Sequence, residues 1–231
     1  MKLLALDTAS ASQSVGLFED DRIVAIAGAS SARGDSERIL LLVERVLELA
    51  GHGLSTIDAV SVSRGPGSLT GLRVGIGTAR GIALGAGKPL YGVSTLQALA
   101  AALGAGPLVL ALLDAGRHEV YGGLFRPGSP PRPIGRERVG PPQWFAEAVA
   151  GKSVRIAGNG AARYRDLFPE ASFTPALGEE FLAAGVGRVA AACTRGGTEP
   201  GGGGSLVCGG EGWEATPVYL RREPPPVRFE E

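Results

Sequence analysis

The sequence predicts an α/β protein made of two related lobes, and three observations support this prediction. Over the first hundred of the 231 residues, short apolar runs alternate with helical patterns in the order β-β-β-α-β-α-β-α. The opening motif returns later: Leu4–Asp7 aligns with Ala111–Asp114, and Val15–Phe18 aligns with Gly122–Phe125, both at an offset of 107 residues. The composition, 44% hydrophobic and 20% charged, is that of a globular protein, and the length suits one large domain or two small lobes that share a core.

The first lobe is expected to span residues 1–104. Three strands joined by short turns open it, and Glu19-Asp20-Asp21 forms the turn between the second and the third. A helix capped by Asp35 or Ser36 follows and ends at Gly51. In chain order, the expected strands cover 2–7, 14–18, 22–27, 58–63 and 89–93, and the expected helices cover 36–50, 69–85 and 95–103.

The second lobe is expected to span residues 105–215 and to open with the repeated hairpin. A proline-rich connection over 127–142 follows the hairpin, and a glycine-rich loop lies near 196–212. The tail, 216–231, is expected to return to the first lobe. The remaining elements are strands over 108–113, 118–125, 153–157 and 217–221, and helices over 143–150 and 179–194.

Composition excludes several classes of function. Lys+Arg and Asp+Glu both number 23, so the net charge is zero. A neutral chain argues against a surface that binds nucleic acid all over, although a local basic patch stays open. No apolar run reaches the roughly 18–20 residues of a membrane span, and the early Asp7 interrupts any signal peptide. A cytoplasmic protein without a membrane partner is therefore expected.

Metal, redox and hydrolytic chemistry have little support. His52 and His118 are 66 positions apart and no His-x-x-x-His motif exists, so no metal site is expected. Cys193 and Cys208 would be a disulfide or redox pair in one interpretation, but two reduced thiols are favoured because no Cys-x-x-Cys motif is present. No G-x-S-x-G motif or paired nucleophile and base occurs, so no catalytic residue is assigned.

Two helices of the first lobe have apolar surfaces broader than one sheet requires. The helix over 36–50 is apolar around about half its circumference, against about 100° for a one-sided helix. It therefore packs on another helix of the chain or on another subunit. The helix over 69–85 holds five glycines, each costing about 1 kcal/mol relative to alanine. Its flat face fits either close packing on the chain's own sheet or a groove for a partner helix. The candidate interface residues are Ile39, Leu40, Val43, Val46, Leu47, Gly71, Val74, Gly75, Thr78, Gly81 and Ile82.

The loop over 65–71 follows a strand and precedes a helix, which is the setting of a phosphate-binding loop. It lacks the P-loop lysine, and its glycine spacing is one residue longer than the dinucleotide fingerprint. A turn with capping hydroxyls is therefore the favoured interpretation. Asp7 and Asp114 end equivalent strands, where a carboxylate holds Mg²⁺ through water in some proteins. The candidate nucleotide-cleft residues are Asp7, Thr8, Gly65, Gly67, Ser68, Thr70 and Asp114.

Five segments resemble, in order, those of a known family. They are Leu4–Ala9, Gly65–Gly75, Pro89–Leu96, Asp114-Ala115 with Glu119-Val120-Tyr121, and Pro217–Arg221. Together they resemble the TsaB (YeaZ) family, the dimerization subunit of the bacterial complex that makes threonylcarbamoyladenosine in tRNA. The resemblance covers residues 1–125 well, is weak over 126–216, and returns at Pro217.

The resemblance implies a two-lobed ASKHA fold (actin, Hsp70 and sugar kinases) and a subunit that is not itself the enzyme. It implies a scaffold that binds and activates TsaD, which transfers the threonylcarbamoyl group to N6 of adenosine 37 in tRNAs that read codons beginning with A. Implied partners are TsaD, the ATPase TsaE, a second copy of the chain when TsaD is absent, and tRNA through the complex. No cofactor is required, although weak binding of ATP-Mg or ADP-Mg at the cleft or subunit junction is an open expectation. The alternative is an independent ATP-binding kinase or ATPase of the same fold, whereas a peptidase lacks a nucleophile–base pair.

The chain departs from the family pattern at two places. Asp35-Ser36-Glu37 stands where the family commonly has His-Ser-Glu, which is expected to alter contacts or pH dependence at the start of the interface helix. Asp114-Ala115-Gly116 stands where the family usually has Asp-Ala-Arg, with Arg117 one place later. The second departure puts any role of that arginine at the cleft in doubt.

Overall fold

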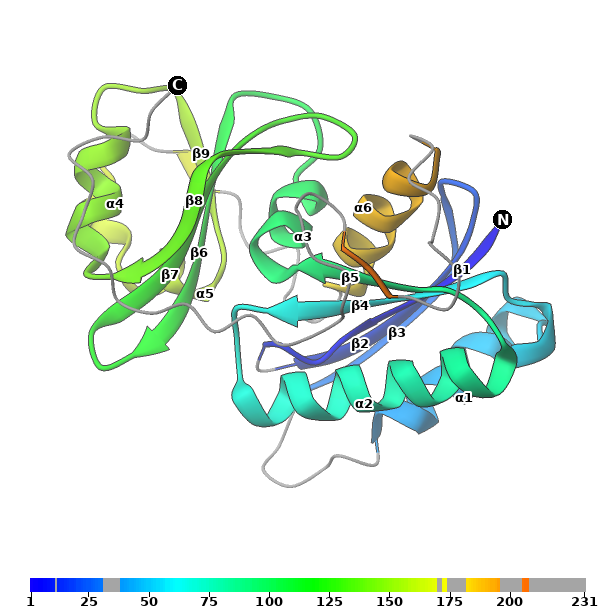
Figure 1. The fold of residues 1–231 in the computed structure, drawn as a ribbon. Coiled ribbons are helices and arrows are strands. Elements are labelled where there is room, and N and C mark those ends of the chain that lie inside the picture. Colours follow the sequence, from blue (N-terminus) through cyan, green and yellow to red (C-terminus); the bar gives the residue numbers. More distant parts are fainter. Residues whose placement is uncertain (11, 31–37, 170–171, 174–181, 196–204, 208–231) are drawn as a thin grey trace.

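Two mixed sheets with helices on their faces make up the protein (Figure 1). The computed structural model describes residues 1–10, 12–30, 38–169, 172–173, 182–195 and 205–207. The first sheet has six strands in the order β11-β5-β4-β1-β2-β3, and the second has five in the order β10-β9-β6-β7-β8. Their strands are β1 (Lys2–Asp7), β2 (Ser12–Glu19), β3 (Arg22–Ser30), β4 (Ala59–Gly65), β5 (Leu90–Ser94), β6 (Leu108–Gly116), β7 (Glu119–Arg126), β8 (Arg132–Gly140), β9 (Val154–Ala157), β10 (Ser172–Phe173) and β11 (Ser205–Val207).

The two sheets repeat one topology. In the first, β1 to β3 form an antiparallel meander, and β4 and β5 continue the sheet in parallel on the other side of β1. In the second, β6 to β8 form the meander, and β9 and β10 continue in parallel beside β6. This repetition confirms the prediction of two related lobes that each open with an aspartate-ended hairpin.

In the structure, the two hairpins of the repeat align only when a gap of one residue is allowed. Asp7 pairs with Ser14, whereas Asp114 pairs with Val120 and not with Tyr121, the position that a constant offset of 107 assigns. The second hairpin turns through only Arg117 and His118, both with left-handed backbone (φ 51° and 64°) as tight two-residue hairpins require. The single-offset alignment of the return strands is therefore wrong by one residue.

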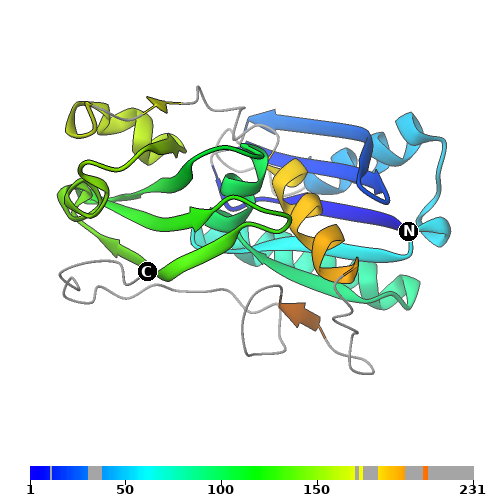
Figure 2. The same ribbon diagram turned by 90° about the horizontal axis from the view of Figure 1, so that it is seen from above.

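Helices form layers on both faces of the first sheet. Figures 1 and 2 show α1 (Arg38–Ala50) and α2 (Leu69–Ala86) on one face, and α3 (Thr95–Ala102) and α6 (Ala183–Arg195) on the other, between the two sheets. The outer face of the second sheet carries α4 (Pro142–Val149) and α5 (Asn159–Arg163). Short 3-10 turns, η1 (Leu54–Thr56) and η2 (Arg165–Leu167), complete the described elements.

Each layer boundary has its own apolar core. Between the sheets, Leu3, Phe18, Val93 and Leu96 of the first lobe pack with Val109 and Phe125 of the second and with α6 residues such as Val189. Beneath the first sheet, Leu4, Leu6 and Val62 pack against α1 and α2. The alternation of β1, with Leu3 and Ala5 on one face and Leu4 and Leu6 on the other, is the period-two pattern of a strand covered on both faces.

The second half of the chain differs from the sequence prediction in several places. The segment over 127–142, predicted as a proline-rich connection, contains the strand β8. Pro133 is compatible with this strand because β8 lies at the edge of the sheet, where proline is tolerated. Within the predicted glycine-rich loop, Ser205–Val207 form β11, which pairs in parallel with β5. Residues 196–204, 208–212, the tail 216–231 and Cys208 lie outside the described residues.

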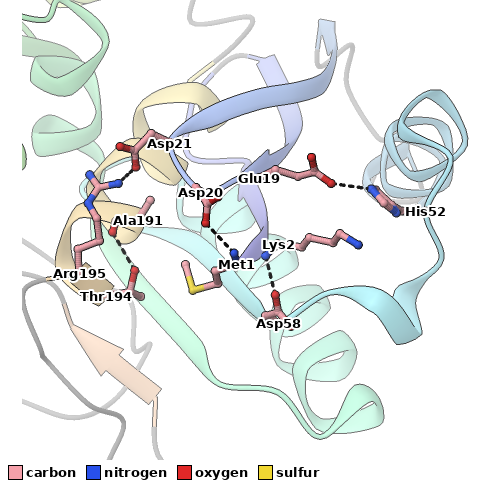
Figure 3. Close-up of polar contacts among 10 residues, drawn as sticks. All are labelled: Met1, Lys2, Glu19, Asp20, Asp21, His52, Asp58, Ala191, Thr194 and Arg195. Atoms are coloured by element: carbon pink, nitrogen blue, oxygen red, sulfur yellow. Dashed lines mark hydrogen bonds and ion pairs between the residues drawn. The ribbon is translucent and has the colours of Figure 1, made fainter.

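The division into 1–104, 105–215 and 216–231 stays a prediction. The structure adds that α6 and β11, both assigned to the second lobe, pack on and extend the first sheet. Near the amino terminus, two polar contacts lie within the first lobe and a third joins α6 to it (Figure 3). The Met1 ammonium pairs with Asp20 at 2.7 Å, the Lys2 amide donates to Asp58 at 2.7 Å, and Arg195 of α6 pairs with Asp21 of the β2–β3 turn.

Candidate functional site

The turn after β1 packs directly on the start of α2. The Thr8 hydroxyl donates a hydrogen bond to the Gly71 carbonyl at 2.7 Å. A β-carbon at Gly71 would lie 1.9 Å from the Thr8 carbonyl oxygen, and one at Gly75 would lie 2.1 Å from the Thr8 hydroxyl. Gly71 and Gly75 are therefore glycine because the backbone and the side chain of Thr8, respectively, lie against this side of the helix.

The loop over 65–71 is closed onto the same turn. The Ser68 amide donates to the Ala9 carbonyl at 2.8 Å, and the Ser68 side chain accepts a hydrogen bond from the Gly71 amide at 3.2 Å. A β-carbon at Gly67 would lie 2.4 Å from the Ala9 carbonyl oxygen. Two of the amides that a phosphate would need thus already have acceptors. The geometry agrees with the favoured interpretation of a turn with a capping hydroxyl.

The two strand-end aspartates have local partners. Asp7 is fully buried and accepts hydrogen bonds from the Ala9 amide at 3.3 Å and the Ser10 hydroxyl at 3.4 Å. Asp114 pairs with Arg163 of α5 at 2.6 Å and accepts from the Gly116 amide at 3.0 Å. The hydrogen bond and charge of Asp114 raise the pKa of the Arg163 guanidinium above its ordinary value. The cation opposite Asp114 thus comes from α5, and neither Gly116 nor Arg117 supplies it.

A polar link between the lobes was missed by the sequence analysis. The Ser94 hydroxyl, which caps α3 by accepting from the Gln97 amide at 3.2 Å, donates to the carboxylate of Glu137 on β8. The Gln97 side chain donates to the Pro131 carbonyl at 2.9 Å in the β7–β8 connection. Burial raises the pKa of Glu137, and the Ser94 hydrogen bond and the charge of Arg64 oppose this rise. The sequence feature that could have revealed this link is Glu137, a single acidic residue between Arg136 and Arg138. It was overlooked because the prolines around it made the segment look like a loop.

The other candidate surface is the exposed side of α1 and α2. Five of its predicted residues are instead buried within the lobe, a correction to the sequence analysis: Ile39, Val43, Val46 and Leu47 face the first sheet, and Gly75 faces Thr8. Gly71, half-buried, also contacts Thr8. The broad apolar arc of α1 mixed core positions with surface positions, which helical periodicity alone does not separate.

Val74 is partly buried against the core beneath the first sheet, and the other four predicted residues, Leu40, Thr78, Gly81 and Ile82, line a groove between the two helices. Its volume is about 850 Å³, and it is lined by Leu40, Leu54, Ser55, Thr78, Gly81, Ile82, Gly85, Ala86 and Lys88. Leu40 is 52% exposed and Leu84, close by on α2, is 86% exposed. A β-carbon at Gly77, Gly81 or Gly85 would meet nothing within 4 Å, so this side of α2 is bare. Exposed leucines around a groove of small residues mark a surface suited to a second helix.

Neither a metal-binding cluster nor a membrane-spanning helix is found among the residues that the structure describes. Within the described ranges, no group of three or more His, Cys, Asp and Glu side chains is placed to hold a metal ion. Among the same residues, no helix combines the length and apolarity that crossing a bilayer takes. Cys193 of α6 is half-buried.

Comparison with known proteins identifies the family. The family model for TsaD, tRNA N6-adenosine threonylcarbamoyltransferase, matches residues 26–130. The TsaB protein of Escherichia coli K12, named for tRNA threonylcarbamoyladenosine biosynthesis, is 43% identical over 124 residues, which is 52% of this chain and 53% of the relative. The match thus spans about half the length of that curated relative.

Solved structures extend the match to the whole fold. The structure of YeaZ from Pseudomonas aeruginosa is 32% identical, with a TM-score of 0.75, and the match covers 95% of this chain and 99% of that one. A ROK hexokinase from Thermus thermophilus, 15% identical with a TM-score of 0.52 over 84% of this chain and 98% of its own, shares the fold alone. The lobes accordingly have the ASKHA fold, and the chain belongs to the TsaB (YeaZ) family.

Proposed function

We propose that this chain is a non-catalytic subunit of the machinery that makes threonylcarbamoyladenosine in tRNA, and that it docks on TsaD through the groove between α1 and α2. The observation that carries the proposal is the groove itself. Exposed leucines and bare glycines lie together there, although burial of apolar surface is the main source of stability in a folded chain. A second subunit supplies the cover that the described residues do not.

The match to the TsaD family supports the choice of partner. It covers residues 26–130, a stretch that includes both helices of the groove. Two chains with related helix pairs meet face to face across an approximate two-fold axis, as self-complementary surfaces do. The same surface serves a homodimer when TsaD is absent. TsaE and tRNA join through the resulting complex, in the cytoplasm.

The cleft residues support a non-catalytic role. The β1–β2 turn fills the loop over 65–71, and Asp7 and Asp114 are each satisfied locally. An ATP-dependent kinase needs free phosphate-binding amides and accessible carboxylates at this place. No observation on these residues favours the kinase alternative, and no nucleotide is required for docking.

Paired substitutions on α1 test the docking surface. Leu40 and Leu49 are similarly exposed (52% and 55%), but nine helical positions separate them, which places them on opposite flanks. We expect Leu40→Glu to abolish co-elution with TsaD from the same organism and to lower tRNA modification in the reconstituted system to the level without this chain. Leu49→Glu is the matched control and should leave both unchanged. If Leu40→Glu binds TsaD like the unaltered chain, the groove is not the docking site.

A further inference from the structure

Charge is divided unevenly along this chain, although its formal net charge is zero. Residues 108–169, which include β6 to β9, α4 and α5, hold nine Lys or Arg and five Asp or Glu residues, a net charge of +4. The balancing acids follow directly in the sequence: residues 170–214 hold six Glu and two Arg, so the second lobe as a whole is neutral. The positive charge is therefore local to one described part of this lobe, and a local basic cluster attracts anions.

Three exposed arginines concentrate this charge on the β7–β8 hairpin. Arg126 and Arg132 are direct partners in the antiparallel register, which places their β-carbons about 5 Å apart. Arg136 lies further along β8, the outermost strand of the second sheet. All three are exposed, and none makes a hydrogen bond or ion pair with another described residue. Like charges directly opposite each other destabilise a strand pair, so this arrangement gains stability when an anion binds between them.

The neighbouring charges leave these three arginines uncompensated. Glu137, the one acid of β8, is turned toward Ser94 between the lobes, and adjacent strand residues point to opposite faces. Other arginines of this lobe are used internally. Arg155 donates to the carbonyls of Leu103 and Gly104, both at 2.9 Å, and Arg163 pairs with Asp114.

We propose that Arg126, Arg132 and Arg136, the basic edge, bind the phosphate backbone of RNA. Guanidinium groups bind phosphate through paired hydrogen bonds. Contacts to the backbone position an RNA without reading its sequence. This inference rests on the proposed function, because it takes tRNA as the RNA, and it adds a direct contact to the indirect one expected from the family.

The distribution of apolar surface favours RNA over an acidic protein. Every exposed large hydrophobic side chain among the described residues belongs to the first lobe, from Met1 to Leu84. Protein interfaces depend on buried apolar or aromatic anchors, and no exposed large hydrophobic side chain lies on the described residues of β7 and β8. The pocket beside the β7–β8 connection is lined by prolines and small residues together with Asp21, Arg188 and Arg195, and no aromatic side chain of a described residue lines it. The two lobes thus divide the work: the first carries the apolar docking groove, and the second carries the basic edge.

The test compares two charge-matched double variants of the full chain. Arg126→Gln with Arg132→Gln removes the opposed pair, and Arg22→Gln with Arg45→Gln removes two exposed cations of the first lobe. Fluorescence anisotropy with labelled tRNA, from 50 to 200 mM salt, gives the affinity and its salt slope. At about 0.1 M salt we expect the first variant to bind roughly 10-fold more weakly per arginine removed, with a salt slope smaller by about one per arginine. The control should bind like the unaltered chain.

Several results would overturn the proposal. They are no binding of tRNA by the unaltered chain up to 100 μM at 50 mM salt, unchanged affinity in the first variant, an equal loss in the control, and loss of TsaD binding with tRNA affinity intact. The last would make the basic edge a protein interface. Self-association of the first variant with normal tRNA affinity would also contradict it, since charges on an edge strand then only prevent strand pairing. Failure of the docking proposal is distinct, because it shows as normal TsaD binding by Leu40→Glu, or as no TsaD binding by the unaltered chain, and not as a change in tRNA affinity.

Discussion

Thr8 and Gly71 are in contact at the point where the first hairpin meets α2. The Thr8 hydroxyl donates to the Gly71 carbonyl at 2.7 Å, and the Thr8 carbonyl lies 1.9 Å from the place of a β-carbon at Gly71. The glycines of α2 therefore have two different roles. Gly71 and Gly75 admit the chain's own turn, whereas Gly77, Gly81 and Gly85 face open space.

Two glycine-to-alanine variants separate these roles. Gly71→Ala forces the turn backbone away, and overpacking of this kind costs about 1–3 kcal/mol. Gly77→Ala meets no atom within 4 Å and should raise the free energy of unfolding by about 0.5–1 kcal/mol, because alanine favours the helix. Urea unfolding of both variants measures the two effects. If Gly71→Ala is as stable as Gly77→Ala, the contact with Thr8 does not constrain the helix.

The same contact changes an expectation drawn from the sequence. If the flat glycine face were a groove for a partner helix, Gly75→Leu would leave the lobe folded and only prevent association. With the Thr8 hydroxyl 2.1 Å from a β-carbon at Gly75, the structure indicates that the variant loses fold stability first. Gly81, which meets nothing, is the position of the predicted interface where a larger side chain tests association alone.

Sequence patterns predicted the order of the helices and strands better than they predicted which side of each helix is buried. The repeat at Asp7 and Asp114 indicated two lobes, and the sheets repeat one topology. Periodicity located α1 and α2 but could not tell Leu40, exposed at the groove, from Val43, buried on the sheet. Both lie on the apolar side of one helix, and only the position of the sheet separates them.

The second lobe was harder to predict because its signals are weak. Prolines around β8 looked like a loop, yet Pro133 lies in an edge strand. The link between Ser94 and Glu137 joins residues 43 positions apart, and no local pattern reports such a contact. Resemblance to the family also faded over this region, so it could not supply the missing elements.

Titration with ATP-Mg tests whether the cleft has kept a nucleotide site. Because the Ser68 and Gly71 amides already have acceptors, we expect the lone chain to show no binding tighter than about 10 μM. Isothermal titration calorimetry measures this directly. A dissociation constant below about 10 μM, with binding abolished by Asp7→Asn but not by Glu147→Gln, would favour the independent kinase or ATPase over the scaffold.

Glu137 predicts a pH-dependent stability with a definite sign. Burial raises its pKa, so the folded protein holds this proton more tightly than the unfolded chain does. The free energy of unfolding therefore falls as pH rises from the unfolded-state pKa through the folded-state pKa. Glu137→Gln keeps an oxygen for the Ser94 hydroxyl and cannot ionise. We expect it to match the unaltered chain below both pKa values and to exceed its stability increasingly above them.

Unfolding curves at a series of pH values between 4 and 8 measure that difference. Glu147→Gln is the matched control for the chemical change, since Glu147 is exposed on α4. A Glu137→Gln protein that becomes less stable than the unaltered chain as pH rises would contradict the prediction. It would mean that the charge of Arg64 stabilises the carboxylate more than burial disfavours it.

The crossing of α3 and α6 predicts how firmly the layer between the two sheets is held. A β-carbon at Gly185 would lie 2.0 Å from the Ala98 carbonyl oxygen, so the two backbones touch at this point. Since α6 also packs on β1 and β2, and its first amide donates to Ser14 at 2.9 Å, it has little freedom to move away.

We expect Gly185→Ala to lower the free energy of unfolding by about 3 kcal/mol, at the upper end for overpacking. Ala184→Gly, the neighbouring control, should cost only about 1 kcal/mol through helix propensity. Urea unfolding gives both values, and amide exchange in α3 shows whether the loss arises at the crossing. Equal destabilisation by the two variants, with α3 still protected, would mean that the helices separate easily and that the crossing does not hold the lobes together.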